Sequence, residues 1–474
     1  MSLRKRTVTG LLWTLGQQVG VQGVNFVVQI VLARILLPED FGLIAMLYVF
    51  IAIGNSLVDG GMTSSLIRTE NPDNRDYSTV FYMNIVVSIV IYCVIFIGSP
   101  LIASFYSQSE LSSILRIYSL VVVIQSFNAV QTSKLTKEMN FKLQMIMQIP
   151  SVLVAGVVGI VLAKAGFGVW SLVYMQLVNA LLFTVQHWLF ANWRPGLVFD
   201  KEKLKLHFSF GYKLTLSGLL STVYSNIYKI IIGKYYPPAQ LGFFHQANTL
   251  SMFPVNNLSK ALFKVTFPVF SSIQHNEDKL RNAYLKTGRY VFWVICPVMI
   301  FLIFFAKPIF LILLTEKWVS AVPYFQILAA AAIFYPHSLY SLNILAAKGR
   351  SDLHLKIELY KKLLSIATLV ILMFKYGIWG IVIASALSML IHFVINAYTC
   401  GVEISYSFAK QIFSFVPALS LSCSLCISLL LIFGDKIQLV GLISVGFIYF
   451  LLYILMSLLT KMFDLKEVKA LITQ

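Results

Sequence analysis

Polar and cationic side chains recur at helical intervals inside long apolar stretches of this sequence. Steps of three or four residues keep such side chains on one face of a helix, where together they could bind a polar ligand. Amides and hydroxyls suit a neutral ligand, and ammonium or guanidinium groups suit an anion. The candidates are Gln18, Gln22, Asn25 and Gln29 in one stretch, Ser217, Ser221, Ser225 and Lys229 in a second, Asn256 and Lys260 in a third, and Arg116 in a fourth.

The charges inside these apolar stretches are mostly positive. Six cations stand against two acids, Asp59 and Glu358, and Glu358 can pair with Lys361 or Lys362 one turn further on. A net cationic, hydrated interior would suit an anionic ligand, such as a sugar linked through phosphate. Asp59 is a candidate protonatable group for ion coupling, and its alternative role is a structural hydrogen bond. The embedded cations are Arg116, Lys213, Lys229, Lys260, Lys264 and Lys307.

Each polar face also has a purely structural interpretation. Hydrogen bonds between helices can hold a membrane bundle together, and lysines near helix ends can extend their ammonium groups to the water interface. Two polar faces at equivalent positions of an internal repeat favour a hydrated cavity instead.

The sequence has no recognisable catalytic or metal-binding pattern. Its seven histidines are scattered, Cys423 and Cys426 lie inside an apolar stretch, and we find no Ser/His/Asp set or phosphate-binding loop. We therefore expect no enzymatic activity, no metal and no cofactor.

Composition identifies a membrane protein. Hydrophobic residues make up 58% of the 474 positions and charged residues 12%, with a mean hydropathy of +0.81. Soluble proteins have roughly 45–50% apolar and about 25% charged residues. The net charge of +18 could suggest nucleic acid as a partner. The basic residues, however, lie in short gaps between apolar stretches, which argues against nucleic acid.

About fourteen transmembrane helices are expected. With both termini in the cytoplasm, 25 of the 37 Lys and Arg residues fall in cytoplasmic segments, 6 on the opposite side and 6 within spans. This bias follows the positive-inside rule. It predicts a multi-pass membrane protein in contact with membrane lipids, with both termini in the cytoplasm.

The chain also repeats itself. Residues 31–42 align with 231–242, pairing Arg34 with Lys234, Pro38 with Pro238 and Gly42 with Gly242, and residues 168–173 align with 377–382. The predicted architecture is all-α, with a six-helix lobe at 1–205, a second at 206–400, and two further helices with a cytoplasmic tail at 401–474. Repeats of this kind are typical of transporters that bind substrate between the two halves.

Several segments resemble a known family. Leu32-Ala-Arg-Ile-Leu-Leu-Pro-Glu-Asp-Phe-Gly-Leu43, residues 266–274, Glu316-Lys-Trp318 and the two Gly-x-Trp pairs are similar to polysaccharide transporters of the multidrug/oligosaccharidyl-lipid/polysaccharide flippase superfamily, particularly the Wzx-type and colanic-acid-exporter-like flippases. The resemblance implies two lobes around a central cavity. It also implies alternating-access translocation of undecaprenyl-diphosphate-linked oligosaccharides for O-antigen, capsule or exopolysaccharide assembly. A polysaccharide polymerase and glycosyltransferases would be the pathway partners.

Two other functional classes fit the sequence less well. An ion-coupled drug antiporter on the same fold would favour embedded carboxylates that bind cationic drugs, whereas this interior is net cationic. A membrane-bound polymerase or ligase would be expected to carry a large outer loop with catalytic residues, and the longest hydrophilic gap here is about 191–207.

Overall fold

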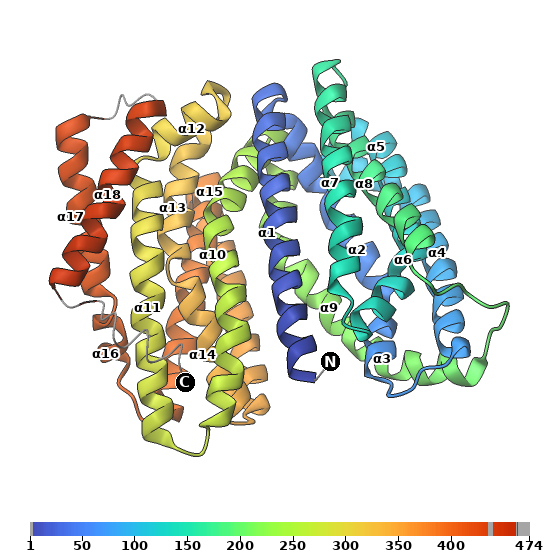
Figure 1. The fold of residues 1–474 in the computed structure, drawn as a ribbon. Helices are drawn as coiled ribbons and strands as arrows, with labels where there is room; N and C mark the ends of the chain where they lie inside the picture. The colour runs from blue at the N-terminus through green and yellow to red at the C-terminus, as the bar shows by residue number, and fades with distance from the viewer. Residues whose placement is uncertain (1–2, 435–438, 461, 463–474) are drawn as a thin grey trace. The chain divides into compact units, whose positions relative to one another are not determined.

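The computed structural model describes residues 3–434, 439–460 and 462, with side chains except at 3–12, 14–15, 260–261 and 263–265. Over these residues the regular elements are helices, which confirms the predicted all-α membrane fold (Figure 1). The chain forms two compact units, unit 1 (residues 1–242) and unit 2 (residues 243–474). The lobe boundaries at 205 and 400 stay predictions.

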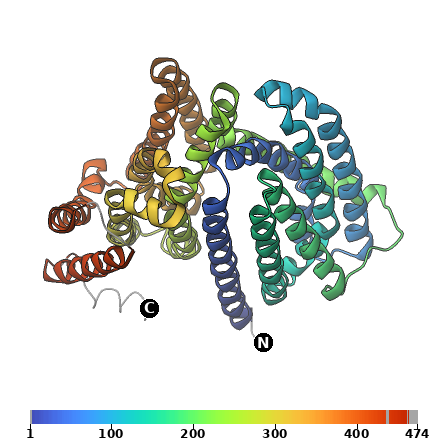
Figure 2. The same ribbon diagram turned by 90° about the horizontal axis from the view of Figure 1, so that it is seen from above.

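Unit 1 is a bundle in which α7 packs beside both α1 and α8 (Figures 1 and 2). Small residues allow these close contacts, since Gly156 faces Val28 and Gly159 faces Met175. α9 packs against α2, α3 and α4. The helices are α1 (Leu3–Ile35), α2 (Pro38–Asp59), α3 (Met62–Arg68), α4 (Asn74–Tyr106), α5 (Glu110–Tyr118), α6 (Leu120–Lys137), α7 (Phe141–Lys164), α8 (Val169–Phe190) and α9 (Lys201–Tyr235).

Unit 2 is built around α11, which packs against α13 and α17, and around α14 and α15, which pack against each other. Its elements are α10 (Pro238–Ser272), whose first residues belong to unit 1, α11 (Glu277–Phe304), α12 (Ala306–Leu314), the 3-10 helix η1 (Glu316–Ala321), α13 (Val322–Ala332), α14 (Tyr335–Ala347), α15 (Ser351–Glu403), α16 (Phe408–Phe413), α17 (Val416–Phe433) and α18 (Leu439–Leu459).

Helix ends follow local sequence signals. Asp73 caps α4 by accepting hydrogen bonds from the backbone N–H groups of Arg75 and Asp76, and Asp200 caps α9 in the same way. Gly60 and Gly61 have φ values of +52° and +63°, and separate α2 from α3.

α15 is two helices joined at Gly377, where φ is +58° and ψ is −133°. Gly168, its partner in the sequence repeat, has φ +52° and ψ −131° just before α8. The repeated Gly-x-Trp motif therefore has the same unusual backbone in both copies.

Eleven segments of the described chain are long and apolar enough to cross a membrane. α9 and α10 are long but carry polar stripes, and they are not among the eleven. If the two halves of α15 are counted separately and α9 and α10 are added, the total is fourteen transmembrane helices. This number stays a prediction. Large apolar side chains such as Leu431 and Phe447 are highly exposed, as lipid-facing residues would be.

Candidate functional site

Lys229 lies on α9 beside the neighbouring helix α2. Its Nζ donates to Oδ1 of Asn226 at 3.2 Å and lies 5.2 Å from the centre of the Tyr48 ring. An amide oxygen and an aromatic face each stabilise an ammonium group without neutralising it. No ion pair is recorded for Lys229 among the described residues, so its positive charge remains available to an anion.

Three predicted site residues continue the same stripe of α9. Ser217, Ser221 and Ser225 are exposed in unit 1, and the Ser225 hydroxyl donates to the carbonyl oxygen of Thr222 within the helix. Exposed polar groups at membrane depth require water or protein beside them. This stripe therefore fits a hydrated surface, with Lys229 at one end.

The predicted face of α1 is only partly covered. Asn25 is exposed, whereas Gln18, Gln22 and Gln29 are half-buried. The adjacent Gln17 donates a hydrogen bond to Gln148 of α7.

The other predicted site residues lie elsewhere. Arg116 on α5 donates to Ser99 Oγ of α4 at 2.9 Å and stacks 4.6 Å from the centre of the Phe96 ring, so it is not part of the α9 stripe. In unit 2, Asn256 on α10 is half-buried, and the side chain of Lys260 lies outside the described residues.

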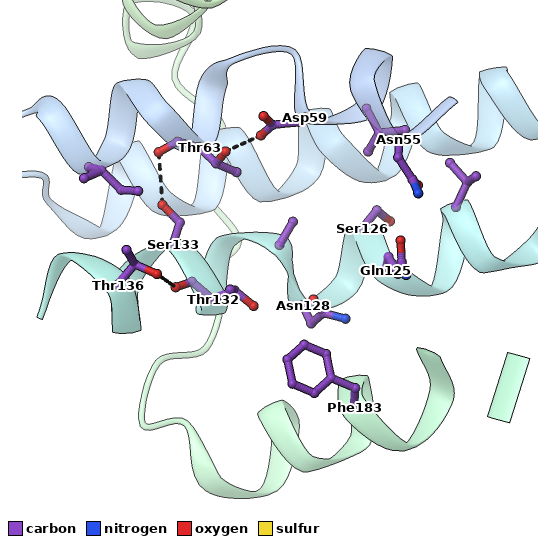
Figure 3. A pocket seen from close by; sticks show the side chains of 14 residues that line it. Asn55, Asp59, Thr63, Gln125, Ser126, Asn128, Thr132, Ser133, Thr136 and Phe183 are labelled. Carbon is purple, nitrogen blue, oxygen red and sulfur yellow. Dashed lines mark hydrogen bonds between the residues drawn. The ribbon is translucent and has the colours of Figure 1, made fainter. Parts of the chain in front are cut away.

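A cavity of about 400 Å³ lies within unit 1, between α2, α3, α6 and α8 (Figure 3). Its lining combines one carboxylate with amides and hydroxyls. Of these lining residues, Asp59 is the one predicted from the sequence as a site residue. The lining polar residues are Asn55, Asp59, Thr63, Gln125, Ser126, Asn128, Thr132, Ser133 and Thr136.

Asp59 points into this cavity and accepts a hydrogen bond from the Thr63 hydroxyl (Figure 3). The backbone carbonyl of Thr63 in turn accepts from Ser133 Oγ at 3.1 Å. Carboxylate, amide and hydroxyl oxygens are the ligands that hard cations prefer. The cavity could therefore hold a proton or a small hydrated cation.

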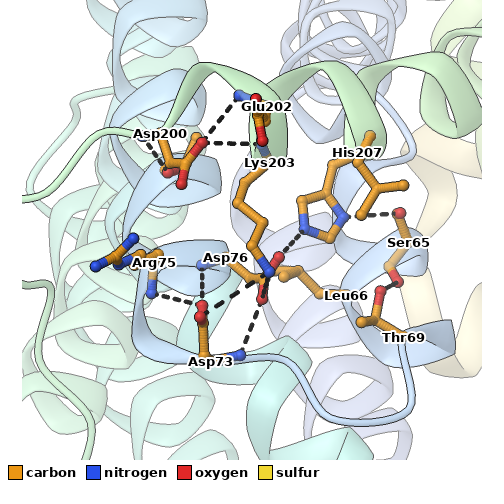
Figure 4. Close-up of polar contacts among 12 residues, drawn as sticks. Ser65, Leu66, Thr69, Asp73, Arg75, Asp76, Asp200, Glu202, Lys203 and His207 are labelled. Atoms are coloured by element: carbon orange, nitrogen blue, oxygen red, sulfur yellow. Dashed lines mark hydrogen bonds and ion pairs between the residues drawn. The ribbon is translucent and has the colours of Figure 1, made fainter.

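A second polar assembly ties the start of α9 to α3 and α4 (Figure 4). The Asp76 carboxylate is fully buried, and it contacts Lys203 Nζ at 2.9 Å and His207 Nε2 at 3.0 Å. The other ring nitrogen of His207 lies 2.8 Å from Ser65 Oγ. We call Ser65, Asp76, Lys203 and His207 the α9 anchor.

The anchor contains a Ser–His–Asp chain that sequence inspection missed. Its members lie 131 and 142 residues apart, so no local motif could reveal the contact. Ser65 is only 6% exposed and His207 is fully buried, which leaves no room for a substrate at the hydroxyl. The arrangement is therefore suited to holding α9 in place.

Backbone contacts reinforce the anchor. A Cβ on Gly211 of α9 would lie 2.2 Å from the carbonyl oxygen of Gly60, so α9 crosses the α2–α3 turn in direct contact.

Lys203 precedes the apolar part of α9, and its hydrogen bond to Asp76 raises the pKa of its ammonium group. The ammonium is therefore held in its charged form.

Curated relatives with similar sequences serve in polysaccharide assembly. The lipopolysaccharide biosynthesis protein WzxC of Escherichia coli (strain K12) is 25% identical over 400 residues, covering 84% of this chain and 81% of WzxC. The succinoglycan biosynthesis transport protein ExoT of Rhizobium meliloti (strain 1021) is 25% identical, covering 69% and 67%. The teichuronic acid biosynthesis protein TuaB of Bacillus subtilis (strain 168) is 27% identical, covering 63% and 62%.

Solved structures share the fold at low identity. A structure of the lipid II flippase MurJ in an inward closed conformation has a TM-score of 0.75 at 12% identity, covering 96% of this chain and 99% of that one. An inward-facing multidrug resistance MATE transporter has a TM-score of 0.62 at 19% identity, covering 82% and 95%.

The family comparison extends over most of the chain. The profile of a family described as polysaccharide biosynthesis protein matches residues 31–323, which include both copies of the Pro-x-x-x-Gly repeat and all of α9. The chain belongs to this polysaccharide biosynthesis protein family.

Proposed function

We propose that this protein is a flippase that moves undecaprenyl-diphosphate-linked oligosaccharide repeat units across the bacterial cytoplasmic membrane by alternating access. The units would then enter the assembly of O-antigen, capsule or exopolysaccharide. Family membership and the polysaccharide pathways named for WzxC, ExoT and TuaB support the proposal. So does the 12%-identical MurJ fold, which accommodates a lipid-linked substrate in another protein.

The environment of Lys229 is the observation that supports a phosphate-bearing glycolipid as the substrate class. Its ammonium group is held by an amide oxygen and an aromatic ring, and the hydroxyls of Ser217, Ser221 and Ser225 continue along the same helix. A diphosphate needs a cation, and a sugar chain needs hydroxyl and amide partners. A single stripe therefore offers both kinds of group to a phosphate-bearing glycolipid.

Coupling to an ion gradient is assigned to Asp59 in the cavity of unit 1. Its carboxylate accepts a hydrogen bond from Thr63 and lines the same cavity as several amide and hydroxyl side chains, so it could bind a proton or a small cation.

The proposed orientation places both termini in the cytoplasm, because the loops on that side carry most of the Lys and Arg residues. Substrate would arrive from glycosyltransferases of the same pathway, and a polymerase would use it on the opposite side. No nucleic acid and no catalytic step are part of this function.

A complementation experiment tests the proposal. A strain that lacks its polysaccharide flippase would express the wild type, Lys229→Ala or Lys213→Ala, and surface glycan and lipid-linked oligosaccharide would be measured. Lys213 is the matched control, because it lies on the same helix, is exposed, and has a recorded contact with the ring of its neighbour Tyr212.

Lys229→Ala should abolish glycan export at normal protein abundance, with lipid-linked oligosaccharide accumulating in the membrane. Lys213→Ala should export normally. Normal export by Lys229→Ala would remove that residue from the site. If wild-type protein raised drug resistance without restoring glycan, the antiporter alternative would replace the flippase.

A further inference from the structure

Unit 2 contains a buried ionic cluster that the proposed site does not use. Lys361 in the first half of α15 is 2% exposed, although its side chain ends in an ammonium group. At 1.5 Å per residue it lies about 15 Å along the helix from Ser351. An ionisable residue at such depth in an apolar helix is costly to retain and is typically tied to function.

The contacts of Lys361 are specific. Its Nζ donates to the Glu358 carboxylate and, at 3.0 Å, to Oδ1 of Asn396 in the second half of α15. The Asn396 amide nitrogen donates to both the carbonyl oxygen and the hydroxyl of Ser338 on α14, at 3.1 and 2.7 Å. These two bonds fix the orientation of the amide, so that its oxygen faces the ammonium.

Glu358 differs from Lys361 in accessibility. Its side chain is 30% exposed, whereas the side chain of Lys361 is 2% exposed. The carboxylate is thus the more accessible member of the pair.

Other proton-exchanging groups line up with the pair. His354, Glu358, Lys361 and Ser365 follow at steps of four, three and four residues, which places them on one face of α15. His392, from the second half of α15, lies 3.5 Å from Ser365 Oγ through its Nε2 atom. The row runs from the beginning of the helix inward, as proton relays in membrane proteins do.

The surrounding elements add few charges. Lys362 is the neighbouring cation on α15 itself, and α13 carries no charged residue. His337 of α14 packs its ring against Phe393, and Lys410 of α16 is exposed. Glu358 is therefore the carboxylate that faces Lys361.

From this juxtaposition we propose that Glu358 and Lys361 form a proton-binding site in unit 2. One proton from water adds to the Glu358 carboxylate and forms a carboxylic acid, and the net charge of the pair changes from zero to plus one. The ammonium of Lys361 then loses its counter-charge in a region of low dielectric. A conformation in which Lys361 reaches water becomes favoured, so proton binding drives a structural change.

The coupling of this change to glycan movement rests on the function proposed above, whereas proton binding itself does not. Protein in lipid nanodiscs would be titrated with acid while infrared spectroscopy records the carbonyl band of protonated carboxyl groups. Glu403→Gln is the matched control, because Glu403 ends the same helix and pairs with Arg350 at 2.6 Å.

A component of the band that is present in the wild type and in Glu403→Gln, but absent in Glu358→Gln, supports the site. In Lys361→Met the band should appear at a higher pH, because the carboxylate has lost its counter-charge. An unchanged band in Glu358→Gln overturns the proposal. If Glu358→Gln does not fold, Glu358→Asp keeps the carboxyl group and should shift the band, and an unshifted band also overturns it.

A measurement of glycan export tests whether proton binding at this site is coupled to transport. Glu358→Gln and Lys361→Met should reduce glycan export at least tenfold at normal abundance, and wild-type export by Glu358→Gln would overturn coupling. If the wild-type protein itself exports no glycan, the proposed function fails, and the infrared titration still decides proton binding.

Discussion

A methyl group on Gly42 would lie 1.9 Å from the carbonyl oxygen of Pro238, well inside van der Waals contact. The reverse relationship has the same value, since a methyl group on Gly242 would lie 1.9 Å from the carbonyl oxygen of Pro38. These four residues are the equivalent positions of the sequence repeat. The repeat is therefore present in unit 1 as a reciprocal backbone contact between the starts of α2 and α10.

Gly42→Ala should destabilise the protein by about 1–3 kcal/mol, because the added methyl group must displace backbone that cannot move freely. Thermal unfolding in detergent would measure the loss. Gly98→Ala is the control, since a Cβ there meets no atom within 4 Å. Equal stability of the two variants would contradict the contact.

Gly377→Ala should also lower stability, for a different reason. A φ of +58° with ψ −133° is accessible to glycine and strained for alanine, by about 1–3 kcal/mol. Gly168→Ala should behave alike, because its backbone is nearly the same. A variant melting at the wild-type temperature would show that this bend relaxes at no cost.

The contribution of the α9 anchor to the stability of the folded protein should depend on pH in the alkaline range. The pKa of Lys203 is raised in the folded protein, so the stability it contributes is complete below its unfolded pKa of about 10.4 and is lost as pH rises through the folded value. Wild type should therefore melt above Lys203→Met at neutral pH, and the difference should shrink above about pH 10.4. A constant difference across that range would contradict an ionic role for Lys203.

Asp59→Asn tests the cavity of unit 1. The amide keeps the shape of the side chain and removes its charge, so glycan export should fall at least tenfold while abundance stays normal. Thr63→Val serves as a comparison, since it removes the hydroxyl that donates to Asp59 and keeps the carboxylate. Its export should fall less than that of Asp59→Asn, and the reverse order would assign the role to the hydroxyl.

Sequence periodicity predicted the helices and the polar stripe of α9, because those features depend on residues three or four positions apart. It also offered Lys361 or Lys362 as the ion-pair partner of Glu358, and the structure pairs Glu358 with Lys361. The same periodicity was available for the unit 1 cavity, where Gln125, Asn128 and Thr132 recur on one face of α6.

The anchor was beyond such reasoning. Asp76 looks like part of an ordinary capping box with Asp73, and only the tertiary fold brings His207 and Lys203 to it. Burial was equally hidden, since no local pattern distinguishes the sealed Lys361 from the exposed Lys213. Long-range packing decides which polar groups in an apolar stretch become partners.

The anchor of α9 has a consequence for biogenesis. A single helix with so many hydroxyls and lysines partitions weakly into lipid when it leaves the insertion machinery without other helices beside it. The Asp76 carboxylate and the Gly60 carbonyl, however, already stand in the earlier part of the chain and offer α9 a docking surface. Membrane integration of α9 should therefore wait for the preceding helices to assemble, and those helices act as its template during synthesis.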